Sequence, residues 1–533
     1  MKGRQLRRSA GVLTPLFSLY SQKSIGVGEF SDLNLLVDWC KKTGLSIIQL
    51  LPVNDAGLHL RPYDSESSFA LDPVHASLEN IAHAPIGDFK NEIQRLREAF
   101  PLRGDFYDKT VKKAKLDVLK QIFEKRKASG ESDFRRYCRA QEKWLEPYCQ
   151  FKVLKDRFGA AGWIDWPPEY RDRDKDVMGR LAKTEVFGLE FYRWVQWQLY
   201  LQFRKAKEYA KKKGVRIMGD IPFLVSRDSA DVWMSPQYFK LELSAGAPPD
   251  QFFADGQEWG MPPYCWKEIQ DSGYEYVTGK LRYAENFYDL FRIDHFVGVF
   301  RVWTFRFGLP YEERRKTGAF DPPDEKVWED HGRRIVEAMM QSTSMQACAE
   351  DLGAVPKCSD RVLEDYGIPG MDVQRWMRHW ETTREYKKPS EYRASAIAVL
   401  STHDTSPLWA WWKWEAGDED ERQKFWQWIG LAGPFEAEPS VKFAEASLKT
   451  ISSTQSLFSI QLLGDWLCLA GIPKDKDPNY RINVPGVVNE TNWRQRAPFS
   501  LEEMQKLPAN KKILSMNQLS GRSTTHLRGV GDK

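Results

Sequence analysis

The stretch FRIDHFVGVFR, residues 291–301, decides the fold. Its apolar residues are typical of a buried strand, yet Arg292, Asp294 and His295 are set into it. Arg292 and Asp294 lie two positions apart, so on a strand they project to the same face. They could form a buried ion pair that only stabilises the fold, or the guanidinium could keep Asp294 ionised for chemistry. The stretch alone leaves both alternatives open.

Other apolar runs also end in carboxylates. These are VRIMGDIPF (215–223) with Asp220, MQACAEDLG (345–353) with Glu350, and SAIAVLSTHD (395–404) with Asp404. A (β/α)8 barrel gathers the C-terminal ends of all its strands around one mouth, where catalytic groups lie. An open sheet would spread the same residues along a line. We therefore predict the α/β class, a (β/α)8 TIM barrel with helical and loop insertions.

The rest of the chain fits one barrel with additions. Amphipathic patterns predict helices over 32–44, 193–214 and 333–344, each leading into an apolar strand. Residues 101–160 are charged and helix-prone, so we expect a helical insertion packed on the barrel. Residues 240–290 and 305–330 are rich in Pro, Gly and aromatics and are expected to form long irregular loops. We expect residues 1–533 to form a single catalytic unit.

Composition excludes several classes of function. Lys and Arg total 78 against 74 Asp and Glu, which lacks the basic excess of a nucleic-acid binder. The seven cysteines contain no C-x-x-C pair, which argues against a zinc site and for a cytoplasmic protein. No apolar run reaches the ~18 residues that cross a bilayer. We expect neither nucleic acid nor a membrane as a partner.

Two carboxylates of opposed pKa at one mouth are suited to breaking a glycosidic bond. Arg292 should keep Asp294 ionised as a nucleophile, and an anionic Asp294 should raise the pKa of Glu350, which would then act as a general acid. Structural explanations exist for some of these residues. Asp404 could cap a helix, and Asp220 could be an ordinary turn residue. The aromatic content of 13%, with 21 Trp, suits sugar rings, whose apolar faces stack on flat side chains.

The motifs together resemble the 4-α-glucanotransferases (amylomaltase, or disproportionating enzyme) of glycoside hydrolase family 77. The resemblance covers nearly the whole chain. It rests on GVLTPLFSL, IGVGEFSDL, LLPV, PYDSESSFALDP, GDIPFLVSRDSADVW, GAPPDQFFADGQEWG, FRIDHF, AEDLG, THD and RINVPGVVNETNWRQR, in that order.

The resemblance implies a double-displacement mechanism with Asp294 as nucleophile, Glu350 as acid/base and Asp404 as transition-state stabiliser. It also implies that α-1,4-glucans and maltooligosaccharides are substrates, that glucose or maltose is an acceptor, and that neither a metal nor an organic cofactor is needed. A loop over residues 247–259 is expected to cover the cleft. The residues implied to bind substrate are Tyr63, Asp220, Gln257, Trp259, Arg292, His295 and His403.

The chain departs from the usual family pattern at a few positions. Met261 and Asp72 stand where Asn is common, and Thr405 follows THD where Asn is usual. These changes leave the three carboxylates intact and bear on donor and acceptor preference. Two alternatives to a transferase are an α-glucan hydrolase on the same barrel and a non-catalytic glycan-binding protein. The second should have lost a catalytic carboxylate, and all three are present.

Overall fold

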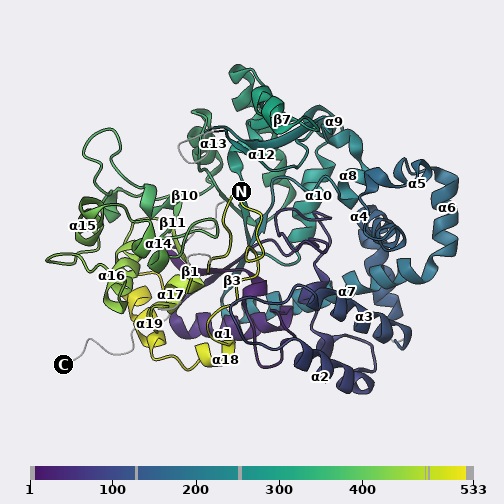
Figure 1. Ribbon diagram of the computed structural model, residues 1–533, viewed down its shortest axis with the longest axis horizontal. Helices are drawn as coiled ribbons and strands as arrows, with labels where there is room; N and C mark the ends of the chain where they lie inside the picture. Colours follow the sequence, from purple (N-terminus) through teal and green to yellow (C-terminus); the bar gives the residue numbers. More distant parts are fainter. Residues whose placement is uncertain (1–6, 127–129, 250–254, 474–475, 478–479, 524–533) are drawn as a thin grey trace.

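The computed structural model describes residues 7–126, 130–249, 255–473, 476–477 and 480–523, and its centre is a parallel barrel (Figure 1). Eight strands pair in the order β10-β11-β12-β1-β2-β3-β6-β9. The edge strands β9 and β10 are joined by a hydrogen bond from the Ala349 amide to the Pro369 carbonyl (2.8 Å). The strands are β1 Ser9–Thr14, β2 Ile47–Leu50, β3 Arg216–Ile221, β6 Leu290–Ile293, β9 Gln346–Ala349, β10 Gly370–Val373, β11 Ala396–Val399 and β12 Phe458–Leu462. This architecture confirms the predicted TIM barrel.

Helices connect the strands and surround the barrel (Figure 1). The helices between or after barrel strands are α1 Leu33–Thr43, α7 Val186–Lys213, α10 Glu275–Ala284, α12 Trp328–Ser342, α13 Cys358–Tyr366, α14 Leu408–Trp414, α16 Val441–Ser452, α17 Leu463–Leu467 and α19 Ala509–Leu519. Peripheral helices are α2 Lys90–Ala99, α5 Pro168–Arg171, α6 Lys175–Thr184, α8 Ala230–Met234, α9 Trp266–Asp271, α11 Tyr311–Arg314, α15 Glu419–Trp428 and α18 Leu501–Met504. Between β10 and β11 the chain makes only the 3-10 turns η11 Gln374–Trp376 and η12 Pro389–Glu391.

The expectation of irregular loops over 240–290 and 305–330 is wrong. These regions contain α9, α10 and α11, and they contribute to a second, antiparallel sheet of order β5-β4-β7-β8. Its strands are β4 Leu243–Ala247, β5 Gln257–Glu258, β7 Val302–Arg306 and β8 Ala319–Asp321. They are short, at two to five residues, so they offer little of the alternation that identifies a strand.

The segment 101–160 holds two helices, α3 Val111–Glu124 and α4 Glu131–Arg157. Lys112 of α3 is buried, and its Nζ contacts Asp55 (2.6 Å), Asp72 (3.0 Å) and the Gly57 carbonyl (2.6 Å). Lys152 of α4 adds a second cation 3.3 Å from Asp55. Helices outside the barrel thus hold the segment 54–76, which follows β2.

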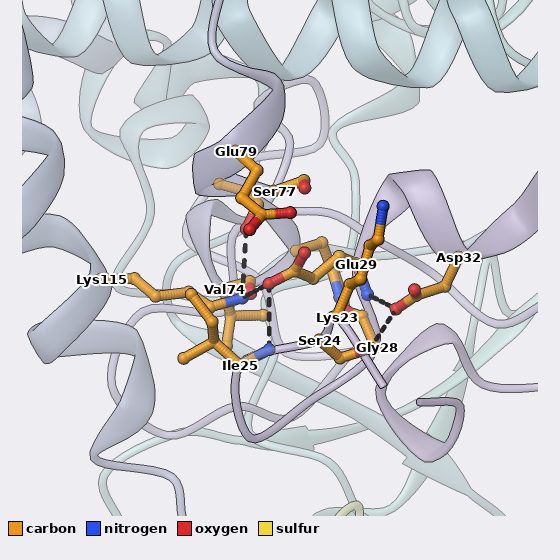
Figure 2. Close-up of polar contacts among 12 residues, drawn as sticks. Lys23, Ser24, Ile25, Gly28, Glu29, Asp32, Val74, Ser77, Glu79 and Lys115 are labelled. Atoms are coloured by element: carbon orange, nitrogen blue, oxygen red, sulfur yellow. Dashed lines mark hydrogen bonds and ion pairs between the residues drawn. The ribbon is translucent and has the colours of Figure 1, made fainter. Parts of the chain in front are cut away.

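Lys115, one helical turn after Lys112, makes a second buried anchor (Figure 2). Its Nζ contacts Glu29 (2.9 Å) and donates to the carbonyls of Val74 (2.9 Å) and Ala76 (3.1 Å). Both charged side chains are at most 3% exposed. Because a buried ion is costly without its partner, each charge depends on the other.

We predict that Lys115→Met lowers the free energy of unfolding by about 3–5 kcal/mol, because Glu29 is left buried and unpaired. Chemical denaturation followed by tryptophan fluorescence measures this. Lys113→Met, on the exposed side of the same helix, should change stability by less than about 0.5 kcal/mol. Equal losses in the two variants would contradict the role of the buried pair.

Candidate active site

The register of the barrel brings Asp294 and Glu350 together. Ile293, the last residue of β6, pairs with Ala349, the last residue of β9. The next residue on each strand is a carboxylate, so the two stand side by side at the C-terminal mouth. Both carboxylates contact the Arg292 guanidinium, Asp294 at 3.0 Å and Glu350 at 2.7 Å, which holds them close together. Each side chain is 21% exposed.

Arg292 lies beneath this pair and binds three carboxylates. One nitrogen, Nη1, contacts both oxygens of Asp220 (2.6 and 2.7 Å) and Asp294 Oδ1 (3.0 Å). The other, Nη2, contacts Glu350 Oε2 (2.7 Å). Asp220 and Arg292 are register partners on β3 and β6, so both side chains point into the barrel. Arg292 is 3% exposed, and its pKa lies well above the usual range because the carboxylates outweigh the cost of burial.

The pKa values of the two carboxyls are opposed, but in the reverse order to the prediction. Burial and the neighbouring Glu350 raise the pKa of Asp294 well above its usual range, more than Arg292 lowers it. Burial also opposes ionisation of Glu350, yet Arg292 and the His295 amide (2.8 Å from Oε2) lower its pKa below normal. His295 adopts a left-handed conformation (φ 44°) that aims this amide at Glu350. The surroundings therefore favour a proton on Asp294 over one on Glu350.

Asp404 lies in the turn after β11 and is held by two side chains. His403 Nε2 is 3.1 Å from Oδ2, and Asn483 Nδ2 donates to Oδ1 at 2.7 Å. Loss of solvent would raise the pKa of Asp404, but His403 and Asn483 lower it to about 2. Arg481 donates to the Asp404 carbonyl (2.7 Å). The turn is therefore fixed, with an ionised carboxylate that is 41% exposed in the cleft.

Aromatic rings form one wall beside Asp404. Tyr63 stacks on His403, with ring centroids 5.1 Å apart and an interplanar angle of 13°. The Trp493 ring packs against both, with ring centroids 5.6 Å from Tyr63 and 6.1 Å from His403. The Tyr63 hydroxyl donates to Asp220 Oδ2 at 2.7 Å. A flat apolar surface with ionised groups at its edge suits a sugar ring.

These groups line one large cleft of about 1830 Å³. Nine of the ten predicted site residues line it: Tyr63, Gln257, Trp259, Arg292, Asp294, His295, Glu350, His403 and Asp404. Trp259 meets His295 edge-on at 4.8 Å, and its Nε1 lies 3.4 Å from Gln257 Oε1. The predicted 247–259 loop lies partly outside the described residues, which omit 250–254.

Asp220 is placed differently from the other predicted substrate ligands. Its side chain is fully buried and lies behind Arg292 and Tyr63. Two residues at the site, Asn483 and Trp493, were not singled out from the sequence. Both belong to RINVPGVVNETNWRQR, so the motif that carried the resemblance held the signal. Among the described residues, no group of three or more His, Cys, Asp or Glu side chains is placed to hold a metal ion.

Known proteins resemble this chain over nearly its full length. The sequence model of the 4-alpha-glucanotransferase family matches residues 14–502. The 4-alpha-glucanotransferase of Chlamydia muridarum is 34% identical over 510 residues, which cover 95% of this chain and 94% of that protein. The corresponding protein of Chlamydia trachomatis is 35% identical over 499 residues, or 93% and 92% of the two chains.

Solved structures show the same fold. An amylomaltase from Streptococcus agalactiae, in complex with acarbose, superposes with a TM-score of 0.82 at 23% identity and covers 97% of this chain and all of that one. The amylomaltase from Corynebacterium glutamicum gives 0.80 at 20% identity, over 97% and 75% of the two chains. The resemblance seen in the sequence is confirmed, and the chain belongs to the 4-alpha-glucanotransferase family.

Proposed function

We propose that this enzyme transfers α-1,4-glucan segments by double displacement with retention. Asp294 attacks the anomeric carbon while Glu350 protonates the leaving glycosidic oxygen, and the C–O bond between the two sugars breaks. The 4-hydroxyl of an acceptor then attacks the glycosyl-aspartate. It gives its proton to Glu350, and the bond to Asp294 breaks. Asp404 stabilises the positive charge on the sugar ring in both steps.

The observation that carries this proposal is that one guanidinium, Arg292, contacts both carboxylates, Asp294 at 3.0 Å and Glu350 at 2.7 Å. An inverting enzyme separates its two carboxyls by ~6.5–9.5 Å to admit a water molecule, whereas a retaining one needs only ~5–5.5 Å. Two carboxylates bound to one guanidinium stand close together, as the second arrangement requires. We propose that the anomeric centre of a glucose unit enters between them.

Substrate binding also favours the transfer of a proton from Asp294 to Glu350, which the chemistry requires. We propose that the free pair holds one proton, which its surroundings favour on Asp294, so that only its position must change, from Asp294 to Glu350. Developing positive charge at the anomeric carbon favours an ionised Asp294. The glycosidic oxygen offers Glu350 an acceptor for the proton. The active form therefore has the same charge as the resting form.

The donor ring is proposed to lie on the wall formed by Tyr63, His403 and Trp493. Arg292 and Asn483 position Asp294 and Asp404 around its anomeric centre. Asp220 acts as a positioning residue, since it contacts Arg292 and Tyr63 from behind. On the opposite side, Gln257, Trp259 and His295 bind the acceptor, which we propose is glucose, maltose or a longer maltooligosaccharide.

Transfer prevails over hydrolysis when a bound acceptor has a higher effective concentration than water. Trp259 and the 246–249 stretch line the cleft beside His295 and supply such a surface. We further propose that residues 1–533 act as one catalytic unit with the 101–160 insertion. A cytoplasmic location agrees with its seven unpaired thiols. Within the described part of the chain, no helix has the length and apolar character that crossing a bilayer requires.

Incubation with maltotriose should give glucose together with maltopentaose and longer chains, resolved by chromatography. The reason is that the glycosyl-enzyme meets a sugar hydroxyl before water. Glucose and maltose without longer products would identify a hydrolase on the same barrel.

Asp294→Asn should lower turnover by at least about 10³-fold, because the amide cannot form the glycosyl-enzyme. Binding of maltoheptaose, measured by calorimetry, should persist. Asp271→Asn, on the exposed end of α9, serves as the matched control and should keep wild-type turnover. Turnover retained in Asp294→Asn would remove this residue as nucleophile.

Glu350→Gln should stop transfer between natural glucans yet still react with α-maltosyl fluoride, whose leaving group needs no protonation. The wild-type pH profile of kcat/KM for maltotriose should be bell-shaped, with an alkaline limb where the pair loses its shared proton. The variant lacks that proton and the Glu350 charge that raises the pKa of Asp294. With the fluoride, its alkaline limb should therefore be absent and its acid limb should shift to lower pH.

The matched control for this experiment is Glu364→Gln, an exposed carboxylate on α13, which should keep the bell-shaped profile. Failure of Glu350→Gln to react with the fluoride would contradict the acid/base role.

A further inference from the structure

The turn that replaces a helix between β10 and β11 carries two exposed tryptophans. Trp376 is 40% exposed and Trp380 is 55% exposed, and both line the cleft that holds the catalytic carboxylates. Thirteen large hydrophobic side chains are exposed in the described part of the chain, and only these two line the cleft. An indole that is exposed to water gains little stabilisation from burial, so these two side chains do not serve the hydrophobic core.

The turn is rigid in its construction. The Trp380 indole Nε1 donates to the Trp376 carbonyl at 2.9 Å, which ties the two residues together. Arg378 stacks on Tyr386 (3.9 Å to the ring centroid) and pairs with Glu421 of α15. The Lys387 amide donates to the Met377 carbonyl at 2.9 Å. Because the Trp380 ring is held by its bond to the Trp376 carbonyl and lies under Arg378 (5.4 Å to the centroid), it loses little conformational entropy on binding.

The turn lies against the Asp404 wall of the cleft. Arg375, which precedes Trp376, donates to the Ser401 hydroxyl (3.1 Å) and the Ser406 carbonyl (2.8 Å), on either side of His403 and Asp404. Strands β10 and β11 and helices α14 and α15 gather on the same side of the molecule (Figure 1). Asp404 is the carboxylate proposed to stabilise the donor sugar. The tryptophans are therefore continuous with the donor side of the cleft.

We propose that Trp376 and Trp380 form a platform that stacks on distant glucose units of the donor glucan. This inference rests on the proposed function and adds a preference for long donors. Each ring offers an apolar face to a sugar ring, while Arg378, Lys387 and Glu391 at the same end of the cleft can bind sugar hydroxyls. A short donor occupies only the units next to Asp294, so it does not reach the platform.

The test compares donors of different length with labelled glucose as acceptor. In the double variant Trp376→Ala/Trp380→Ala, the ratio of KM for maltoheptaose to KM for maltotriose should rise roughly 3- to 10-fold over wild type. A rise of this size corresponds to the loss of one to two ring contacts. Trp376→Phe/Trp380→Phe should recover most of the wild-type ratio, because a flat ring remains. Trp414→Ala, equally exposed at 41% but outside the cleft, is the matched control and should leave the ratio unchanged.

An unchanged ratio, or an equal rise in both KM values, would overturn the platform. With maltotriose as a fixed donor, a changed dependence on acceptor length, from glucose to maltopentaose, would overturn its placement on the donor side. Wild-type enzyme that fails to incorporate labelled glucose would instead refute the proposed function, so the two failures are distinguishable.

Discussion

The site depends on a shortage of positive charge around Arg292. This one guanidinium contacts Asp220, Asp294 and Glu350 and is sealed from solvent at 3% exposure. The nearby His295 cannot compensate, because burial lowers its pKa to about 4. Ionisation of Asp294 beside an ionised Glu350 is therefore unfavourable, because like charges close together oppose one another. A second buried cation would favour ionisation of both and would leave the proposed general acid without its proton.

That constraint also explains why the predicted protonation order was reversed. In the sequence, Arg292 and Asp294 lie two positions apart on one strand, and this spacing predicts a pairing of these two residues alone. In the structure, Nη1 of Arg292 makes its shortest contact with Asp220, and Nη2 contacts Glu350. Glu350 also accepts a hydrogen bond from the His295 amide. Three-dimensional sharing of one donor cannot be seen from residue spacing. The proposed chemistry needs the proton on Glu350, so it assigns the shift of the proton from Asp294 to substrate binding.

Much of the fold could be predicted because the barrel strands are buried on both faces and end in carboxylates. The runs ending in Asp294 and Glu350 are four-residue strands whose pattern is unambiguous, and the resemblance supplied the rest. The second sheet was missed because β5 and β8 have only two and three residues, and because β4, β5 and β8 lie in segments whose Pro and Gly content predicts loops. Asn483 reaches Asp404 from 79 residues away, a contact that neither periodicity nor spacing encodes. Trp376 and Trp380 look like core residues until their exposure is known.

Asp72, which stands where Asn is common in the family, links the 101–160 insertion to the site through its contact with Lys112. Asp72 lies outside the cleft, where its Oδ2 meets Lys112 of α3 at 3.0 Å. A carboxylate here, in place of the usual Asn, is matched by a buried ammonium that also binds Asp55. Between these two aspartates runs the segment that presents Tyr63 to His403. The insertion therefore supports the wall formed by Tyr63, His403 and Trp493, because movement of segment 54–76 would displace the Tyr63 ring from His403.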